Sequence, residues 1–374
     1  MSIPRIGIVG IHGHGRSHVH TVLRGQREGR MVLAAVADTV PAGHGELPAD
    51  VRQMTDVGAM LEPGDLDVVI VSTPIHTHAW IAEASIEAGA DVLLEKPPTA
   101  TMSEFDQLRA LAARSGARVQ VGFQSLGSTA LPALRALVAD GAVGEVQRYG
   151  ASAGWVRDSA YWTRSAWAGR RELDGRVVAD GVLTNPLAHA TATALAVAPA
   201  TDDSDVERVE LDLHRANEIA ADDTSVARLT LADDRRLTTA VTLCAARREE
   251  PYVEIVGDRG RLRFYYAIDV VQHQSDAEAP PFTSRFDRVS LLDDLLAARR
   301  DGGEILAPLA ATGGFMRLLD GVMAAPDPRP ISADHWYDTE DDRGAHRVVR
   351  GVEAALHEAV RSERTFRELG LPWA

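Results

Sequence analysis

The sequence predicts a two-domain protein that begins with a doubly wound α/β fold. Three observations support this prediction. Short apolar runs alternate with helical segments over the first third of the chain, the first run ends in a glycine-rich turn, and the later part contains runs of alternating polarity. At 374 residues the chain is also too long for one ordinary core.

Five short runs in the first third are nearly continuous in apolar residues, which is typical of strands buried on both faces. They are residues 5–10, 32–38, 67–73, 91–96 and 118–123. Helical segments separate them. One of these helices has a predicted capping box at Ser103 and Asp106 and a predicted stop at Gly116. Strands that alternate with helices predict a parallel sheet with right-handed crossovers.

The stretch "GIVGIHGHG" follows the pattern of a dinucleotide-binding loop. Gly10 and Gly15 occupy the first and third glycine positions of G-x-G-x-x-G, while His12 replaces the second and Gly13 follows it. Asp38 ends the next strand, where a carboxylate accepts hydrogen bonds from ribose hydroxyls and repels a 2′-phosphate. These residues predict an NAD site, with NADP less favoured.

Four histidines near this loop raise the alternative of a metal site. They are His12, His14, His18 and His20. His14 and His18 have the i, i+4 spacing of helical metal ligands. However, no cysteine or carboxylate accompanies them locally, and His14 falls where the dinucleotide phosphates would bind. We therefore expect no metal.

Composition excludes several other classes of protein. A formal charge of −15 argues against nucleic-acid binding, which needs a basic surface. The single cysteine, Cys244, suits a reducing compartment. There is neither an apolar leader nor an apolar run long enough to span a membrane. We expect a soluble, cytoplasmic protein.

The stretch "VVIVSTPIHTHAWIAEASIEAGADVLLEKPPTATMSEFDQL" resembles the glucose–fructose oxidoreductase/inositol dehydrogenase (Gfo/Idh/MocA) family. The similarity covers residues 4–124 well and the remainder more loosely. It implies a nucleotide-binding domain over residues 1–124 and a substrate-binding and oligomerisation domain over residues 125–374. The second would be an α+β domain with an open, mainly antiparallel sheet and helices on one face.

The E-K-P motif of this stretch places Lys96 beside the nicotinamide and the substrate carbinol, by resemblance. The resemblance also implies a cis bond between Lys96 and Pro97. A lysine at the carboxyl end of a central strand is partly desolvated, which lowers its pKa and suits proton transfer. Other cofactor contacts implied here are Ser72, Thr73, Pro74, Glu95 and Gln124. His76 and His78 either contact the nicotinamide or simply begin a helix.

Later segments supply the strands that the second domain needs. Residues 208–214, 236–243, 252–257 and 261–266 alternate apolar and polar side chains. Near the end, residues 346–362 are expected to form a helix with Val348, Val352, Ala355 and Leu356 on one face.

The family's second catalytic motif, D-x-x-x-H, matches "LTNPLAHATATAL". His189 falls on the family's histidine, and Asn185 stands where an aspartate is usual. The i, i+4 spacing predicts that both side chains share one helical face. A histidine suits a proton relay near pH 7, whereas asparagine can only orient a partner. A buried histidine with no catalytic role is the alternative.

The segment "WVRDSAYWTRSAWAGRRELDG" combines aromatic and arginine side chains that suit sugar rings and their polar groups. Its candidate substrate residues are Arg157, Tyr161, Trp162, Arg164 and Trp167. A buried aromatic hinge between the domains is the alternative. Asp180 either binds substrate hydroxyls or caps a turn.

These residues predict an NAD-dependent dehydrogenase that oxidises a secondary alcohol of a sugar, polyol or glycoside. One alternative is an NAD-dependent glycosidase or lyase that works through transient oxidation. Another is a dinucleotide-binding sensor without catalysis. The resemblance also implies a homodimer or homotetramer.

Overall fold

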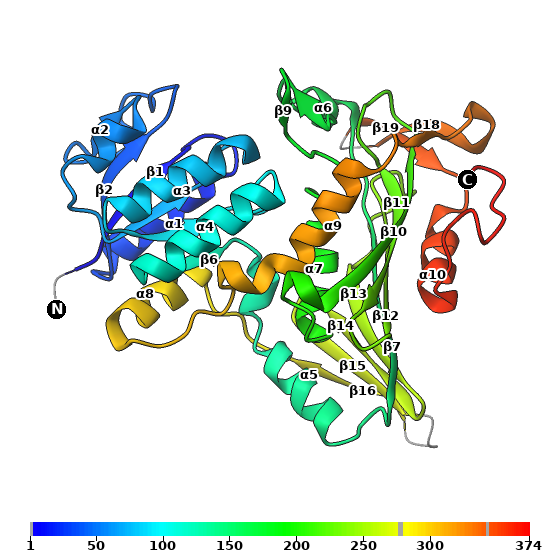
Figure 1. Cartoon of the computed structure of the whole chain (residues 1–374). Coiled ribbons are helices and arrows are strands. Elements are labelled where there is room, and N and C mark those ends of the chain that lie inside the picture. Colours follow the sequence, from blue (N-terminus) through cyan, green and yellow to red (C-terminus); the bar gives the residue numbers. More distant parts are fainter. Residues whose placement is uncertain (1–2, 276–279, 342–343) are drawn as a thin grey trace. The chain divides into compact units, whose positions relative to one another are not determined.

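The computed structural model describes residues 3–275, 280–341 and 344–374. The chain forms two compact units, which are described separately (Figure 1). The first comprises Met1–Gly122 and Ser290–Leu309, and the second comprises Phe123–Val289 and Ala310–Ala374. The expected domain boundary at residue 124 lies close to residue 122, where the chain passes from the first unit to the second. Residues 290–309, however, belong to the first unit and not to the second.

The first unit contains a six-stranded parallel sheet of order β3-β2-β1-β4-β5-β6. Its strands are β1 (Arg5–Val9), β2 (Val32–Ala37), β3 (Arg52–Met54), β4 (Val68–Val71), β5 (Asp91–Leu94) and β6 (Val119–Val121). All four residues of β4 are fully buried, as their continuous apolar character predicts. The predicted doubly wound fold is confirmed. The short strand β3 was missed because its residues, Arg-Gln-Met, form no apolar run.

Helices connect these strands: α1 (Gly15–Arg27), α2 (Val57–Leu61), α3 (His78–Glu87) and α4 (Met102–Ser115), with the 3₁₀ turn η1 (Ile75–Thr77) before α3. The capping box of α4 lies two residues before the predicted one. Thr101 caps the helix and Glu104 closes the box, because Glu104 can reach back to the backbone N–H of Thr101 (3.1 Å). Gly116 ends the helix with φ +72°, as predicted.

The segment that returns to the first unit carries α8 (Leu291–Asp301). Arg299 on this helix pairs with Asp67 (2.9 Å) and Asp91 (3.0 Å), the residues at the starts of neighbouring strands. The amide of Gln120 donates to Asp294 (2.7 Å). Polar contacts of this kind, between residues far apart in sequence, leave no periodic signal in the sequence.

The second unit is built on a nine-stranded, mainly antiparallel sheet of order β16-β15-β14-β13-β7-β12-β11-β10-β17. Its strands are β7 (Val146–Gly154), β10 (Val206–Arg215), β11 (Thr224–Leu231), β12 (Arg236–Thr242), β13 (Tyr252–Gly257), β14 (Gly260–Tyr265), β15 (Val270–Ser275), β16 (Phe282–Arg285) and β17 (Arg329–Pro330). All four predicted strand segments lie in this sheet. The fold class predicted for the second unit is thereby confirmed.

The remaining elements of this unit surround the sheet. They are η2 (Gln124–Gly127), α5 (Ala130–Ala139), α6 (Ser159–Thr163), β8 (Glu172–Leu173), β9 (Arg176–Val177), α7 (Ala188–Val197), η3 (Asp203–Asp205), η4 (Leu309–Thr312), α9 (Gly313–Ala324), η5 (Ala333–His335), β18 (Trp336–Asp341), β19 (Gly344–Val349) and α10 (Val352–Ser362). Helices pack on both faces of the sheet, whereas the resemblance implied helices on one face. On one face, Thr191 of α7 bonds to Thr239 of β12 (3.2 Å). On the other, α10 packs against Ala240 of β12.

The final helix is shorter than predicted. Val348 lies in strand β19, and Gly351, at φ +72°, separates that strand from α10. The apolar residues of this segment fit both the two-residue period of a strand and the 3.6-residue period of a helix. The prediction of one continuous helix was therefore wrong.

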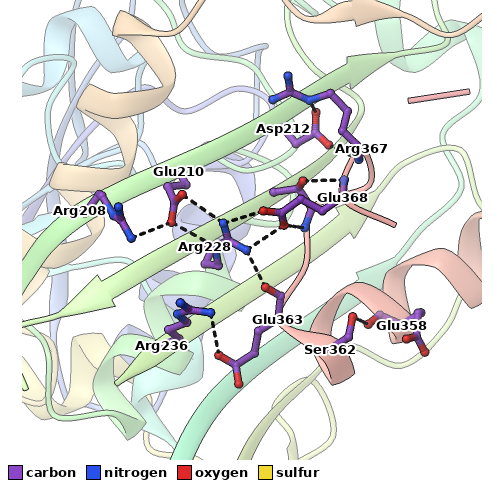
Figure 2. Close-up of polar contacts among 11 residues, drawn as sticks. Arg208, Glu210, Asp212, Arg228, Arg236, Glu358, Ser362, Glu363, Arg367 and Glu368 are labelled. Atoms are coloured by element: carbon purple, nitrogen blue, oxygen red, sulfur yellow. Dashed lines mark hydrogen bonds and ion pairs between the residues drawn. The ribbon is translucent and has the colours of Figure 1, made fainter. Parts of the chain in front are cut away.

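Ion pairs fix the chain end to the sheet (Figure 2). Arg228 on β11 contacts the carboxylates of Glu210 (3.1 Å) and Glu368 (2.8 Å), while Arg367 donates to Asp212 (2.9 Å). These contacts hold the last residues across β10 and β11. Among the described residues, no helix is both long and apolar enough to cross a membrane.

Candidate functional site

The turn between β1 and α1 requires glycine at two of its predicted positions. At Gly10, with φ +84°, a Cβ would overlap the carbonyl oxygen of Ser72. At Gly15, it would overlap the carbonyl oxygen of Gly10. The turn therefore packs directly on the end of β4 and on the start of α1, as the first and third glycines of the dinucleotide fingerprint do.

The middle of this turn is open. Gly13 is exposed, has φ +55°, and has no atom within 4 Å of the position that a Cβ would take. The ring of His12, at the second glycine position, bonds to the carbonyl of Val40 (2.9 Å) beyond β2. Bare backbone at Gly13 and the N-terminus of α1 together leave a cradle that suits a diphosphate. The substitution of His12 is therefore compatible with the fingerprint.

Asp38 lies at the end of β2 and connects to this turn. Its Oδ2 accepts the backbone N–H of Ile11 (2.8 Å), and its Oδ1 accepts that of Val40 (3.0 Å). The carboxylate is partly exposed, so it is held beside the turn with lone pairs still available for hydroxyl groups.

Other predicted cofactor residues lie at the carboxyl ends of β4 and β5, on the same edge of the sheet. Ser72, Thr73 and Pro74 follow β4, and Lys96 follows β5. Lys96 is partly exposed, and the Lys96–Pro97 bond is cis, as expected. His76 lies on η1 and is partly exposed.

His78 begins α3, which is one of the two roles that the sequence left open. Its side chain is buried, with Nδ1 facing the carbonyl of Pro97 (2.8 Å) and Nε2 facing that of Thr73 (2.8 Å). Burial lowers the pKa of this imidazole, so the neutral ring donates to one of the two carbonyls. His78 therefore links the segments after β4 and β5, with each ring nitrogen facing a backbone carbonyl.

Glu95 is buried and meets two histidines of the glycine-turn region. Its Oε1 lies 2.9 Å from Nε2 of His18 and 3.2 Å from Nε2 of His14. Burial opposes ionisation of Glu95, but hydrogen bonds from His14 and His18 outweigh it and lower the pKa of Glu95 below its ordinary value. The hydrogen bond to Glu95 raises the pKa of His14. Glu95 thus joins the segment that carries Lys96 to the start of α1.

The same three side chains are of the kinds that bind metal ions. Their ligand atoms lie within 4.8 Å of one another. The sequence places no carboxylate near His14 and His18, but the fold brings Glu95 to them. The sequence did not predict this contact between α1 and the end of β5. Its only signal in the sequence was the i, i+4 spacing of His14 and His18.

In the second unit, His189 lies in the first turn of α7 and is partly exposed. Its Nδ1 lies 3.4 Å from the hydroxyl of Ser125, which accepts a hydrogen bond from Thr193 (2.7 Å). Phe123 packs edge-on against the ring (5.7 Å between centroids). Ser125 and Thr193 were missed, since isolated hydroxyl residues carry no motif. Gln124, predicted near the cofactor, begins η2 in this unit.

Asn185 does not share a helical face with His189. The helix begins at Ala188, and Asn185 lies in the turns before it. Its amide donates to Oδ1 of Asp180 (2.6 Å). The residue that replaces the usual aspartate therefore contacts a carboxylate five positions earlier.

Asp180 is the centre of a buried hydrogen-bond network. Its side chain is 0% exposed. Both oxygens accept from Arg164 (2.9 and 2.8 Å), and Oδ2 also accepts the N–H of Gly169 (2.7 Å). Burial raises the pKa of Asp180, although Arg164 opposes this effect.

The predicted aromatic and arginine side chains gather around α6. The guanidinium of Arg164 lies over the rings of Tyr161 (3.8 Å) and Trp167 (4.5 Å). Trp162 packs edge-on against Tyr161 (5.0 Å). Burial raises the pKa of Tyr161 to about 12, so its hydroxyl stays protonated. The segment is folded within the second unit and fixed to Asp180.

Comparison with known protein families shows to which family the chain belongs. Residues 4–123 match the family described as "Oxidoreductase family, NAD-binding Rossmann fold", and residues 132–263 match the GFO/IDH/MocA C-terminal domain. The chain belongs to the GFO/IDH/MocA family. Its glycine turn, Asp38 and the strand ends beside Lys96 thus lie in the family's NAD-binding Rossmann domain, and the resemblance drawn from the sequence is confirmed.

Among curated relatives, inositol 2-dehydrogenase 1 of Saccharopolyspora erythraea is 34% identical over 125 residues, which is 32% of this chain and 36% of that protein. The rhizopine catabolism protein MocA of Rhizobium meliloti is 31% identical over 121 residues, which is 32% of this chain and 37% of that protein. The chain thus matches little more than a third of the length of these two relatives.

Solved structures share the fold over most of the chain. The WlbA dehydrogenase of Bordetella pertussis, in complex with NADH and UDP-GlcNAcA, has a TM-score of 0.68 at 21% identity and covers 86% of this chain and 95% of its own. A levoglucosan dehydrogenase in complex with NADH has a TM-score of 0.68 at 18% identity, with 88% and 100% covered.

Proposed function

We propose that this GFO/IDH/MocA protein is an NAD-dependent dehydrogenase acting on a secondary alcohol of a sugar, polyol or glycoside. The observation that carries the proposal is Lys96, which follows β5 on the sheet edge that also bears the glycine turn. Relatives named for inositol and solved structures named for sugar derivatives support the substrate class.

The residues of the first unit fit a dinucleotide. The open backbone at Gly13 and the start of α1 would hold the diphosphate, and Asp38 would hold the ribose hydroxyls. When bound, the nicotinamide supplies the hydride acceptor. Because a carboxylate at Asp38 repels a 2′-phosphate, we propose that NAD binds more tightly than NADP.

Lys96 and His189 are the proposed proton-transfer groups. The neutral amine of Lys96 can accept the proton of the substrate hydroxyl as hydride leaves the carbon, and the ammonium so formed holds it. His189 can act as the relay, since the contact between Ser125 and Nδ1 restricts its ring orientation. Asn185 would orient its neighbours without taking up a proton.

The direct test is a panel of sugars, inositols and glycosides, assayed at 340 nm with NAD and NADP separately. An increase in absorbance at 340 nm, which reports NADH formation, with NAD and at least one member of the panel supports the proposal. If NADH binding is measurable but no member of a broad panel yields NADH, net dehydrogenation is excluded.

A second candidate is an NAD-dependent glycosidase or lyase that oxidises its substrate transiently. The observation that favours it is Asn185, whose amide is turned to Asp180 where the family usually has an ionisable group. Transient oxidation would release a cleaved product without accumulating NADH. Measuring product and NADH in the same reaction separates the two candidates.

A further inference from the structure

Arginine and aromatic side chains alternate in a stack around α6 of the second unit. Arg157 lies over Trp155 and Tyr161, and Arg164 lies over Tyr161 and Trp167. Arg248 also lies over the ring of Trp155. The corresponding guanidinium-to-ring distances are 4.9, 4.8, 3.8, 4.5 and 4.8 Å.

Among the described residues, two of the three cations in this stack have no carboxylate within ion-pair distance. Arg164 is paired with the buried carboxylate of Asp180 (2.8 Å). Within the described part of the chain, neither Arg157 nor Arg248 has a carboxylate within ion-pair distance. The nearby carboxylate of Asp158 caps α6 by accepting the N–H of Tyr161 (2.8 Å). An excess of positive charge is unusual here because the protein carries a formal charge of −15.

Unpartnered hydrogen-bond donors lie in the same stretch. Buried polar atoms without a partner in the described residues include Nε1 of Trp155 and Nε of Arg157. Nε1 of Trp162 and Oγ of Ser165 are in the same condition, ten residues or fewer along the chain. Buried donors normally find acceptors, and a donor left without one destabilises the fold. What this stretch lacks is acceptor oxygens.

An oxyanion supplies both missing properties. A carboxylate or phosphate carries negative charge and several acceptor oxygens, and guanidinium groups bind either one in a paired geometry. Aromatic faces beside it suit the apolar face of a sugar ring. A neutral sugar would supply hydroxyl groups but leave Arg157 and Arg248 without a counter-charge.

We infer that the stack around Arg157 binds the oxyanion of an acidic sugar, either a carboxylate or a phosphate. This inference rests on the proposed dehydrogenase function and narrows its substrate to sugar acids or sugar phosphates. Arg157 is then the residue that selects the acidic substrate, and Arg248 adds a second, weaker contact from the exposed side.

Direct binding tests this inference without requiring turnover. D-Glucuronate, D-galacturonate, D-gluconate and D-glucose 6-phosphate are titrated against the full chain with NADH present, followed by tryptophan fluorescence and calorimetry. Each is compared with its neutral counterpart, D-glucose, D-galactose or D-glucitol. We expect at least one acid to bind tenfold or more tightly than its neutral counterpart, and the preference to shrink as salt rises.

Three variants complete the design. Arg157→Gln should remove the preference for the acid, while Arg157→Lys should keep part of it because the charge remains. Arg170→Gln is the matched control, since Arg170 is exposed in the same segment, and it should keep the full preference. If Arg157→Gln does not fold, Arg248→Gln replaces it, with a smaller expected loss of about threefold.

The outcomes separate this inference from the proposed function. A tighter carboxylate or a tighter phosphate each supports the inference and identifies the ion. Equal binding of acids and neutral sugars, or a preference that survives Arg157→Gln, overturns it. Acid binding without NADH formation leaves the inference intact and contradicts the dehydrogenase proposal. NADH formation from neutral sugars, with no preference for acids, does the reverse.

Discussion

The two units assemble their candidate site residues in different ways. In the first unit, short segments at the ends of parallel strands meet at one sheet edge, and much of the expected cofactor binding is done by backbone at Gly10, Gly13 and Gly15. In the second unit, Arg164, Gly169 and Asn185 converge from one stretch of chain on the buried carboxylate of Asp180. The first arrangement depends on strand topology, and the second depends on one polar centre.

This difference predicts a specific loss of chemistry in the first unit. Lys96→Met keeps the length and apolar volume of the side chain but removes the proton-transfer group. Turnover should fall by about 10²–10⁴-fold, the usual contribution of general acid–base catalysis. The affinity for NADH, measured by fluorescence titration, should change by no more than a few fold. Near-normal turnover in this variant would show that the E-K-P resemblance does not extend to function.

The second unit should instead lose stability when its polar centre is altered. Asp180→Asn leaves Arg164 without its charge partner, and breaking a buried pair typically costs about 3 kcal/mol. Five of the six tryptophans lie in this unit, so fluorescence during urea unfolding reports on it.

Asp327→Asn serves as the control for this change. Asp327 also pairs with an arginine, Arg171, but its side chain is 94% exposed. Its loss should cost less than about 1 kcal/mol. Equal effects of the two substitutions would contradict the central role of Asp180.

A third comparison uses two buried carboxyls with opposite pKa shifts. The histidines that contact Glu95 lower its pKa, whereas burial raises the pKa of Asp222 in the second unit to about 6. Between about pH 4 and pH 6 the folded protein therefore keeps a proton on Asp222 that the unfolded chain has lost. Through this carboxyl, stability falls as pH rises through that window and is constant above it.

Asp222→Asn should remove this pH dependence. As pH rises from 4 to 7, the wild type should lose up to about 3 kcal/mol of unfolding free energy that the variant does not lose. Urea titrations of both proteins at each pH measure the shift. A difference between the two proteins that does not change with pH would mean that Asp222 titrates normally.

The smallest effect is expected at Asp38. Asp38→Ala removes the carboxylate that would repel a 2′-phosphate and should narrow the preference for NAD over NADP about tenfold, or about 1.4 kcal/mol. Titration of both cofactors against the variant and the wild type measures it. An unchanged preference would remove Asp38 from the ribose site.

The same contrast explains how much could be predicted from the sequence. Apolar runs and glycines define the first unit, so its parallel sheet and the places of Gly10 and Asp38 followed from them, while the E-K-P motif nominated Lys96. The contacts between Glu95 and His18, and between Asn185 and Asp180, join residues whose spacing carries no motif. They depend on how distant segments pack together, and for this reason the sequence left the roles of Asp180 and His78 open, whereas the structure buries both side chains.

Isotope transfer tests the central claim most directly. The best substrate from the panel is prepared with deuterium on the carbinol carbon that is oxidised, and the cofactor and product are analysed by mass spectrometry. The account predicts that deuterium appears in the reduced cofactor in a one-to-one ratio with the ketone formed. Product that forms while the deuterium stays on the substrate carbon, or while no labelled cofactor accumulates, would contradict it.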